Sequence, residues 1–275
     1  MKLIRFIFFT SILVLSSCSD YNDNRNEILE SHGNQTCLLN FDNSEFGYSN
    51  ITIENIGDIH NQLVLEYYKE MGLIDNLNSI DNYFRNKISF TQELNASEIQ
   101  NEISSLYEFI HNEQMVTVNL EMSEQEISFF NSILNVVLEA KDVTKTKNNL
   151  DLIQQNIQFL EEDRRIVFEL AIAIGKSSYE LWAPVSLGGL GLHDCLEDIL
   201  EEQEELVRPR NFGSWFAVTA SADITGGLAA AGRTAWTLVV PGWGVGALLS
   251  SGAWGAAVSS TYAGITNSGD ARDCP

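Results

Sequence analysis

Hydrophobic residues between positions 55 and 182 recur every three or four positions, which is the period of an amphipathic α-helix. The clearest segment places Ile56, Ile59, Leu63 and Tyr67 on one face and ends at Gly72. Two further segments follow Ser97 and Ser123, each with Gln or Glu three residues later as a capping box; the others lie around Tyr83–Phe84, from Leu150 to Leu160 and from Ile166 to Gly175. The spacing predicts four or five helices packed as a bundle.

The alternation of apolar and polar residues that is typical of β-strands is almost absent from this part of the chain. The segment Gln114–Met122 is a candidate for one short extended piece. We therefore expect a mainly α fold, in which a helical bundle precedes a different kind of segment at the C-terminus.

The composition of the chain changes abruptly after Arg210. Residues 211–269 contain only two charged side chains, Asp223 and Arg233, but hold 11 of the 19 glycines and four of the five tryptophans. Pro241-Gly242 divides this region into two apolar arms, residues 214–240 and 243–265. The pattern predicts a helical hairpin.

Small residues occupy every fourth position in both arms of this hairpin. The first row is Ala222, Gly226, Ala230 and Thr234, and the second row is Gly252, Ala256, Ser260 and Gly264. Because positions i and i+4 lie on one helix face, such rows allow two backbones to approach closely. The two rows are expected to face each other or a second copy of the chain.

The first 18 residues have the parts of a secretory signal. Lys2 and Arg5 precede an apolar stretch from Phe6 to Leu15, which is too short to span a bilayer. The following Leu15-Ser16-Ser17-Cys18 resembles the signal of bacterial lipoproteins. This resemblance implies removal of residues 1–17 and acylation of Cys18 on its sulfur and on its new amine.

Several acyl chains on one residue provide stable membrane anchoring, which a single chain does not. The expected organisation is therefore a signal peptide at 1–17, a lipidated tether at 18–50, a helical bundle at 51–210 and the hairpin at 211–275. The resemblance implies a location in the bacterial cell envelope. The acidic residues after Cys18 favour the outer membrane or cell surface.

The charge of the chain excludes one large class of partners. Sixteen Lys and Arg residues stand against 38 Asp and Glu residues. Removal of the leader, with its two basic residues, leaves 14 − 38 = −24. Nucleic-acid binding requires basic groups that displace counterions, so we expect no nucleic-acid partner.

No established catalytic or phosphate-binding motif occurs in the sequence, and the four histidines are scattered singly. His60 is a candidate ligand or base, but a histidine hydrogen-bonded beside an apolar stripe is the commoner arrangement. His193-Asp194-Cys195 contains metal-ligand types, although adjacent helical residues point in different directions. The acidic run at 197–205 favours a solvated helix face. We expect no catalytic residue, cofactor or resident metal.

Three cysteines remain after lipidation of Cys18, and an oxidising envelope favours one disulfide among them. Cys195 and Cys274 bracket the glycine-rich region and are the preferred pair. Cys37 with either partner remains an alternative.

These features lead to three functional hypotheses. The first is a non-enzymatic envelope lipoprotein whose hairpin mediates packing, oligomerisation or membrane contact. The second is an antagonistic or pore-forming protein, because the C-terminal region resembles the glycine-zipper hairpins of bacteriocin-like and envelope proteins. The third is an envelope enzyme that uses His60. Self-association and membrane contact through the hairpin are the partner interactions that these hypotheses imply.

Overall fold

The mainly α fold expected from the sequence is confirmed by the computed structural model. The model describes residues 36–39, 48, 50–73, 76–88, 122–202, 215–237 and 245–270, all of which lie in one compact unit, residues 31–275. The described elements are α1 (Thr36–Leu39), α2 (Ile56–Met71), α3 (Leu77–Lys87), α5 (Glu124–Leu138), α6 (Val143–Asn156), α7 (Glu162–Trp182), a 3₁₀ turn (Val185–Leu187), α8 (Leu192–Glu202), α9 (Trp215–Thr237) and α10 (Val245–Asp270).

Local chemistry sets several helix ends. Gly72 ends α2 with a φ of 66°, a conformation that glycine adopts without steric cost. Ser123 and Glu126 form the expected capping box at the start of α5. Asp142 caps α6 by accepting the backbone N–H of Lys145 at 2.8 Å, so this helix begins seven residues before the predicted start at Leu150. The predicted segment after Ser97 and most of the candidate strand lie outside the described residues.

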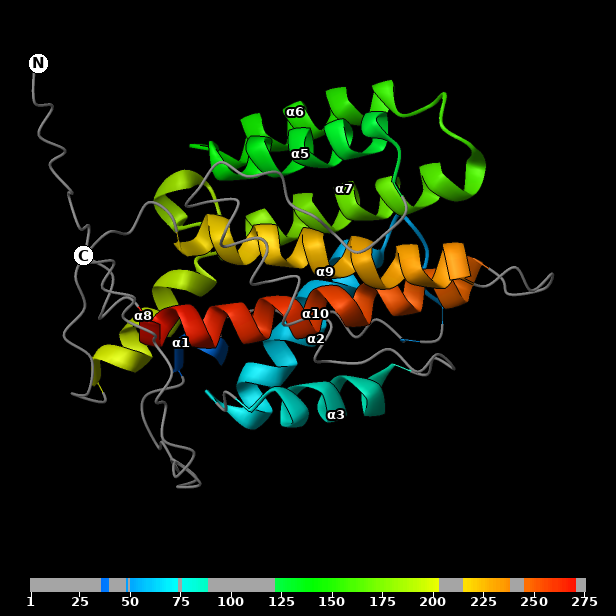
Figure 1. Ribbon diagram of the computed structural model, residues 1–275. Helices are drawn as coiled ribbons and strands as arrows, with labels where there is room; N and C mark the ends of the chain where they lie inside the picture. Colours follow the sequence, from blue (N-terminus) through cyan, green and yellow to red (C-terminus); the bar gives the residue numbers. More distant parts are fainter. Residues whose placement is uncertain are drawn as a thin grey trace, which may run out of the picture. The chain divides into compact units, whose positions relative to one another are not determined.

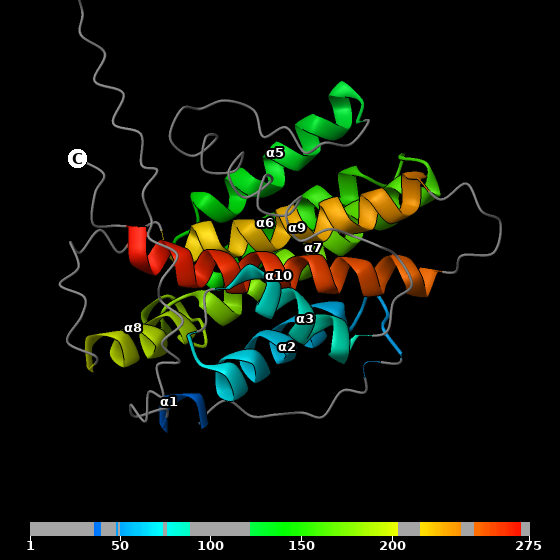
Figure 2. The same ribbon diagram turned by 60° about the horizontal axis from the view of Figure 1, so that its bottom comes forward.

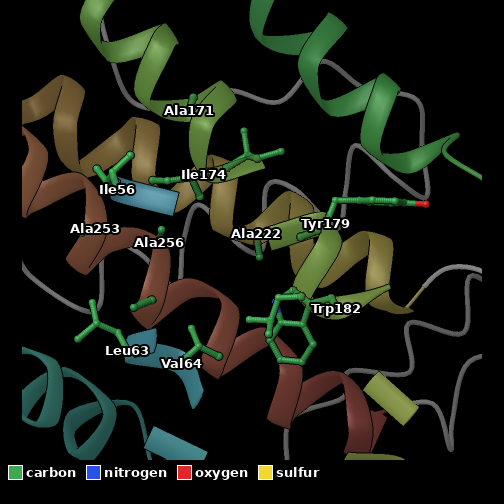
Figure 3. Packing of buried hydrophobic residues seen from close by; sticks show 14 of the residues in the cluster. Ile56, Leu63, Val64, Ala171, Ile174, Tyr179, Trp182, Ala222, Ala253 and Ala256 are labelled. Atoms are coloured by element: carbon green, nitrogen blue, oxygen red, sulfur yellow. The ribbon is translucent and has the colours of Figure 1, made fainter. Parts of the chain in front are cut away.

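The two C-terminal helices form the predicted hairpin, which packs against helices from several parts of the bundle. α7 lies beside α9 and α3 lies beside α10 (Figures 1 and 2), and α2 packs on both α10 and α7. Contacts of α9 with α7 and α5, and of α10 with α2 and α3, agree with this arrangement. Figure 3 shows apolar side chains from α2, α7, α9 and α10 packed against one another.

The first small row packs against α10. A Cβ atom on Gly226 would clash with Ser259 and lie 2.5 Å from the backbone oxygen of Gly255. A Cβ atom on Gly255 would lie 2.5 Å from that of Ala230. Near the end of α9 and the start of α10, Thr234 donates its hydroxyl to Ser251 at 2.7 Å. Glycine therefore stands where the two backbones come closest.

The second small row meets α9 only at the side of the contact, which corrects part of the expectation from the sequence: a Cβ atom on Gly227 would lie 3.4 Å from the Cβ of Ala256 and from the backbone oxygen of Gly252. The α10 residues that approach α9 most closely are Ser251, Gly255 and Ser259, one position before the predicted row. Because successive helical residues are rotated by about 100°, the predicted row faces mainly the surrounding helices.

Contacts at the two ends of the second row show what this face packs against. A Cβ atom on Gly252 would lie 2.5 Å from the side chain of Leu170 in α7. A Cβ atom on Gly264 would lie 2.7 Å from the hydroxyl of Tyr68 and 3.1 Å from the ring of Trp182. Small residues on this face thus admit large side chains from α7 and α2.

The predicted boundary between residues 210 and 211 does not separate two compact units. Residues 31–275 form one unit because α9 packs on α7 and α5 while α10 packs on α2 and α3. The predicted tether at 18–50 also extends too far, since Leu38 in α1 is buried in the core. Within the described residues, no helix combines the length and the apolar character that crossing a bilayer requires.

Cys195 is bonded to Cys37, which corrects the preferred pairing with Cys274. The bond joins α1 to the first turn of α8 across a sequence separation of 158 residues. Proximity in sequence to the hairpin did not indicate this pairing, because α1 packs against α8 and α2. Cys274 lies outside the described residues.

Peptide mapping of the oxidised protein without reductant should recover a Cys37–Cys195 linked peptide. Replacing Cys37 by serine should lower the free energy of unfolding by about 5 kcal/mol in the chain-entropy model, because the bond closes a long loop in the unfolded chain. A linked peptide containing Cys195 and Cys274 would contradict this pairing.

Candidate functional site

Asp223 is the acidic residue in the charge-poor hairpin, and it lies at the centre of a buried polar cluster. Its carboxylate meets His60 from α2 and both Ser178 and Trp182 from α7. The side chains of His60, Ser178, Trp182 and Asp223 are all fully buried. We call these four residues the polar cluster; it joins three helices that are distant in the sequence.

Both carboxylate oxygens of Asp223 have partners in this cluster. Oδ2 accepts hydrogen bonds from the hydroxyl of Ser178 and from Nε1 of Trp182, the latter at 3.1 Å. Oδ1 faces Nε2 of His60 at 3.2 Å. A buried carboxylate is costly unless it is paired and hydrogen-bonded, so these contacts offset the burial of Asp223.

Close packing of α2 on α7 brings His60 to this position. A Cβ atom on Gly57, one turn before His60, would clash with Ser177 and lie 2.9 Å from the backbone oxygen of Ala173. Asn61 strengthens the same contact by donating its amide to the backbone oxygen of Ser177 at 2.9 Å. Gly57 and Asn61 therefore fix the position of the imidazole.

The hydrogen bonds of Asn61 determine the role of Nδ1 of His60. Because Asn61 donates its amide to Ser177, its Oδ1 is free to accept, and this oxygen lies 3.0 Å from Nδ1 of His60. Nδ1 thus carries a proton. Nε2, on the other side of the ring, lies 3.2 Å from Oδ1 of Asp223.

Tyr68 completes the apolar surroundings of the cluster. Its ring meets the ring of Trp182 edge to face, with the centroids 6.1 Å apart. Burial raises the pKa of Tyr68 well above its usual value, and nearby Tyr67 and the Asp223 carboxylate raise it further. Tyr68 therefore stays neutral, which suits an enclosed position against α10.

The hydrogen bonds of the polar cluster connect its helices and do not form the serine–histidine contact that nucleophilic catalysis by Ser178 would need. A serine nucleophile needs a base such as histidine in contact with its hydroxyl. Here the hydroxyl of Ser178 donates to Asp223, and His60 contacts the other oxygen of the same carboxylate. The arrangement holds α2, α7 and α9 together.

A second polar contact fastens α3 to α10. Nε1 of the buried Trp254 donates to Oδ1 of Asp81 at 3.0 Å. Arg85 binds the same oxygen at 2.7 Å, and its guanidinium lies 4.7 Å from the centre of the Trp254 ring. The hairpin is therefore joined by specific polar contacts to α2 and α7 through α9 and to α3 through α10.

The other candidate residues are placed differently from what a metal site requires. The sulfur of Cys195 is used in the disulfide, and Nδ1 of His193 lies 3.4 Å from the carboxylate of Asp194. The ring of His193 packs edge to face on Phe216 of α9. Over the described ranges, no three His, Cys, Asp or Glu side chains are grouped so as to hold a metal ion.

A shallow pocket of about 370 Å³ lies between the end of α5 and the start of α6. Its lining is mixed, with Asn135, Glu139, Lys141, Lys145 and Thr146 among the residues. None of the lining residues belongs to the polar cluster. The pocket and the cluster are thus separate features.

Ser178 and Trp182 were not identified from the sequence. Each lies on the core-facing side of α7, where the helical period predicts burial without a polar partner. The signal that points to them is Asp223 itself, because an acidic residue in an otherwise apolar arm needs donors from neighbouring helices. Cys18, His32 and His111 lie outside the described residues.

Comparisons with protein-family models, with curated proteins and with solved structures find no match for this chain.

Proposed function

We propose that this protein is a non-enzymatic lipoprotein of the bacterial envelope, whose glycine-rich hairpin serves as the packing core of a membrane-tethered helical bundle. The acyl chains on Cys18 hold it in the membrane, with the outer membrane or cell surface favoured. The signal sequence supports the anchor, and the arrangement of α9 and α10 supports the role of the hairpin.

The enclosure of the hairpin carries this proposal. Its first small row packs on α10 within the same molecule, and the face of α10 carrying the second row meets Leu170, Tyr68 and Trp182. Both faces are buried by contacts within the same molecule. We therefore favour packing, rather than oligomerisation or membrane contact, as the role of the hairpin.

The same contacts weigh against the two alternative functions. A pore-forming role would require the hairpin to leave its contacts with α7 and α2 and to break the contacts of Asp223. An enzymatic role for His60 would require access to a side chain that is fully buried and already faces Asn61 and Asp223. We therefore favour a lipoprotein whose exposed surface, rather than a buried site, meets its partners.

Replacing Cys18 by alanine should prevent acylation and removal of the leader, because the acceptor sulfur is absent. The variant should stay at precursor size and lose detergent-phase partitioning as a mature form. Mass spectrometry and Triton X-114 partitioning of the expressed chain measure both effects. A Cys18→Ser variant that lacks the thiol but keeps the size is the matched control and should behave alike. Mature-sized, detergent-partitioning protein from either variant would contradict the lipid anchor.

A further inference from the structure

The turn between α7 and α8, residues 183–191, presents two apolar side chains to solvent. Val185 is 67% exposed and Leu190 is 52% exposed. The backbone of this turn is fixed, because Leu190 donates its N–H to Glu180 at 2.7 Å and Gly191 donates to Ala183 at 2.9 Å. Val185 and Leu190 are therefore held on the surface by a well-bonded turn.

The disulfide fastens the N-terminal part of the chain next to this turn. Cys195 donates its backbone N–H to Gly191, the last residue of the turn, at 3.0 Å, and its sulfur is bonded to Cys37. Cys37 follows Cys18 by 19 residues, which span at most about 65 Å. The first described element after the proposed anchor, α1, is thus bonded next to the turn that carries Val185 and Leu190.

Exposed apolar side chains also occur at the far end of the bundle. Phe159 is 63% exposed and Val245 is 51% exposed. Phe159 precedes α7, whose 21 residues separate it from the α7–α8 turn by about 32 Å. Figure 1 shows the beginnings of α7 and α10 at one end and α8 at the other. This far end provides a control within the same chain.

We propose that the α7–α8 turn contacts the surface of the bilayer that holds the acyl chains of Cys18. Val185 and Leu190 then lie at the boundary between lipid headgroups and acyl chains. This inference rests on the proposed lipid anchor. Tethering raises the effective concentration of the nearby turn at the membrane, and contact with lipid removes apolar surface from water.

Charge near the turn favours a bilayer of neutral rather than anionic lipid. Asp194 accepts the N–H of Val185 at 3.3 Å, and its side chain is 46% exposed. The chain without its leader carries a formal charge of 14 − 38 = −24. An anionic bilayer would repel the Asp194 carboxylate and the negatively charged chain as a whole, so the partner surface is zwitterionic lipid.

Photo-crosslinking of the lipidated full chain in phosphatidylcholine vesicles tests this orientation. A benzophenone amino acid replaces Val185 or Leu190 in two variants, and Phe159 or Val245 in two matched variants. After illumination, mass spectrometry measures the fraction of protein joined to lipid. We expect at least five times more lipid adduct from the α7–α8 turn than from the far end. Equal yields, or higher yields at the far end, would overturn the proposal.

Two controls separate this inference from the function on which it rests. Cys37→Ser protein that circular dichroism shows to be folded should have a ratio of adducts between the two ends closer to one, because the N-terminal chain is then no longer bonded beside the turn; an unchanged ratio would contradict the role given to the disulfide. Failure of the wild-type chain to float with vesicles would contradict the lipid anchor and this inference with it. Flotation with equal adduct yields would contradict the orientation alone.

Discussion

Replacing Asp223 by alanine should lower the free energy of unfolding by about 3–5 kcal/mol, the usual effect of removing one partner from a buried charge pair. The substitution leaves the hydroxyl of Ser178 and Nε1 of Trp182 without their acceptor, and it leaves His60 facing a cavity. Urea unfolding of the mature chain, followed by circular dichroism, measures the loss.

Asp223→Asn is the matched control, because an amide can reproduce most of these contacts. Its oxygen can accept from Ser178 and Trp182, while its nitrogen donates to Nε2 of His60, whose Nδ1 already carries a proton. The expected loss is at most about 1.5 kcal/mol, the value of one ordinary hydrogen bond. Equal losses for alanine and asparagine would show that the contacts of the carboxylate do not hold the three helices together.

Replacing Gly226 by alanine should destabilise the protein by about 1–3 kcal/mol through overpacking, even though alanine is the better helix former. The added methyl group would lie 2.5 Å from the backbone oxygen of Gly255 and would clash with Ser259. Because one obstacle is backbone, relief requires α9 and α10 to move apart. Thermal and urea unfolding of the variants measure this effect.

Two glycines in α10 serve as controls for the substitution in α9, because they have different amounts of space around them. Gly246 is exposed and has open space around it, so Gly246→Ala should be neutral or stabilise by up to about 1 kcal/mol. The loss of stability caused by Gly252→Ala should lie between those of Gly246→Ala and Gly226→Ala, because the added methyl group meets the movable end of the Leu170 side chain. A loss at Gly246 as large as that at Gly226 would refute a specific close approach of the two helices.

The hydrophobic period and the capping residues were sufficient to predict most described helices and the hairpin. The same information could not determine how α10 is rotated. Two adjacent rows of small residues run along this helix, and they differ by one position; Gly255 belongs to the row that faces α9, and Gly252 to the row next to it. Their sizes are alike, so only the shapes of the neighbouring helices decide which row faces α9.

The disulfide and the polar cluster depend on tertiary contacts that the sequence pattern does not encode. Cys37 reaches Cys195 because α1 packs on α8, across 158 residues. Asp223 was visible as a charge in an apolar arm, but its donors Ser178 and Trp182 lie more than 40 residues earlier in α7. Local periodicity predicts that such residues are buried and does not predict which residues they meet.

Amide hydrogen exchange on the lipidated mature chain in phosphatidylcholine vesicles tests most directly whether the hairpin is the core of the bundle. We expect the amides of residues 222–234 in α9 and 251–261 in α10 to be among the slowest to exchange, with protection equal to the free energy of global unfolding. Their protection should be the same in vesicles and in detergent. Exchange of these amides faster than that of α5 and α6, or protection that appears only in vesicles, would contradict the account.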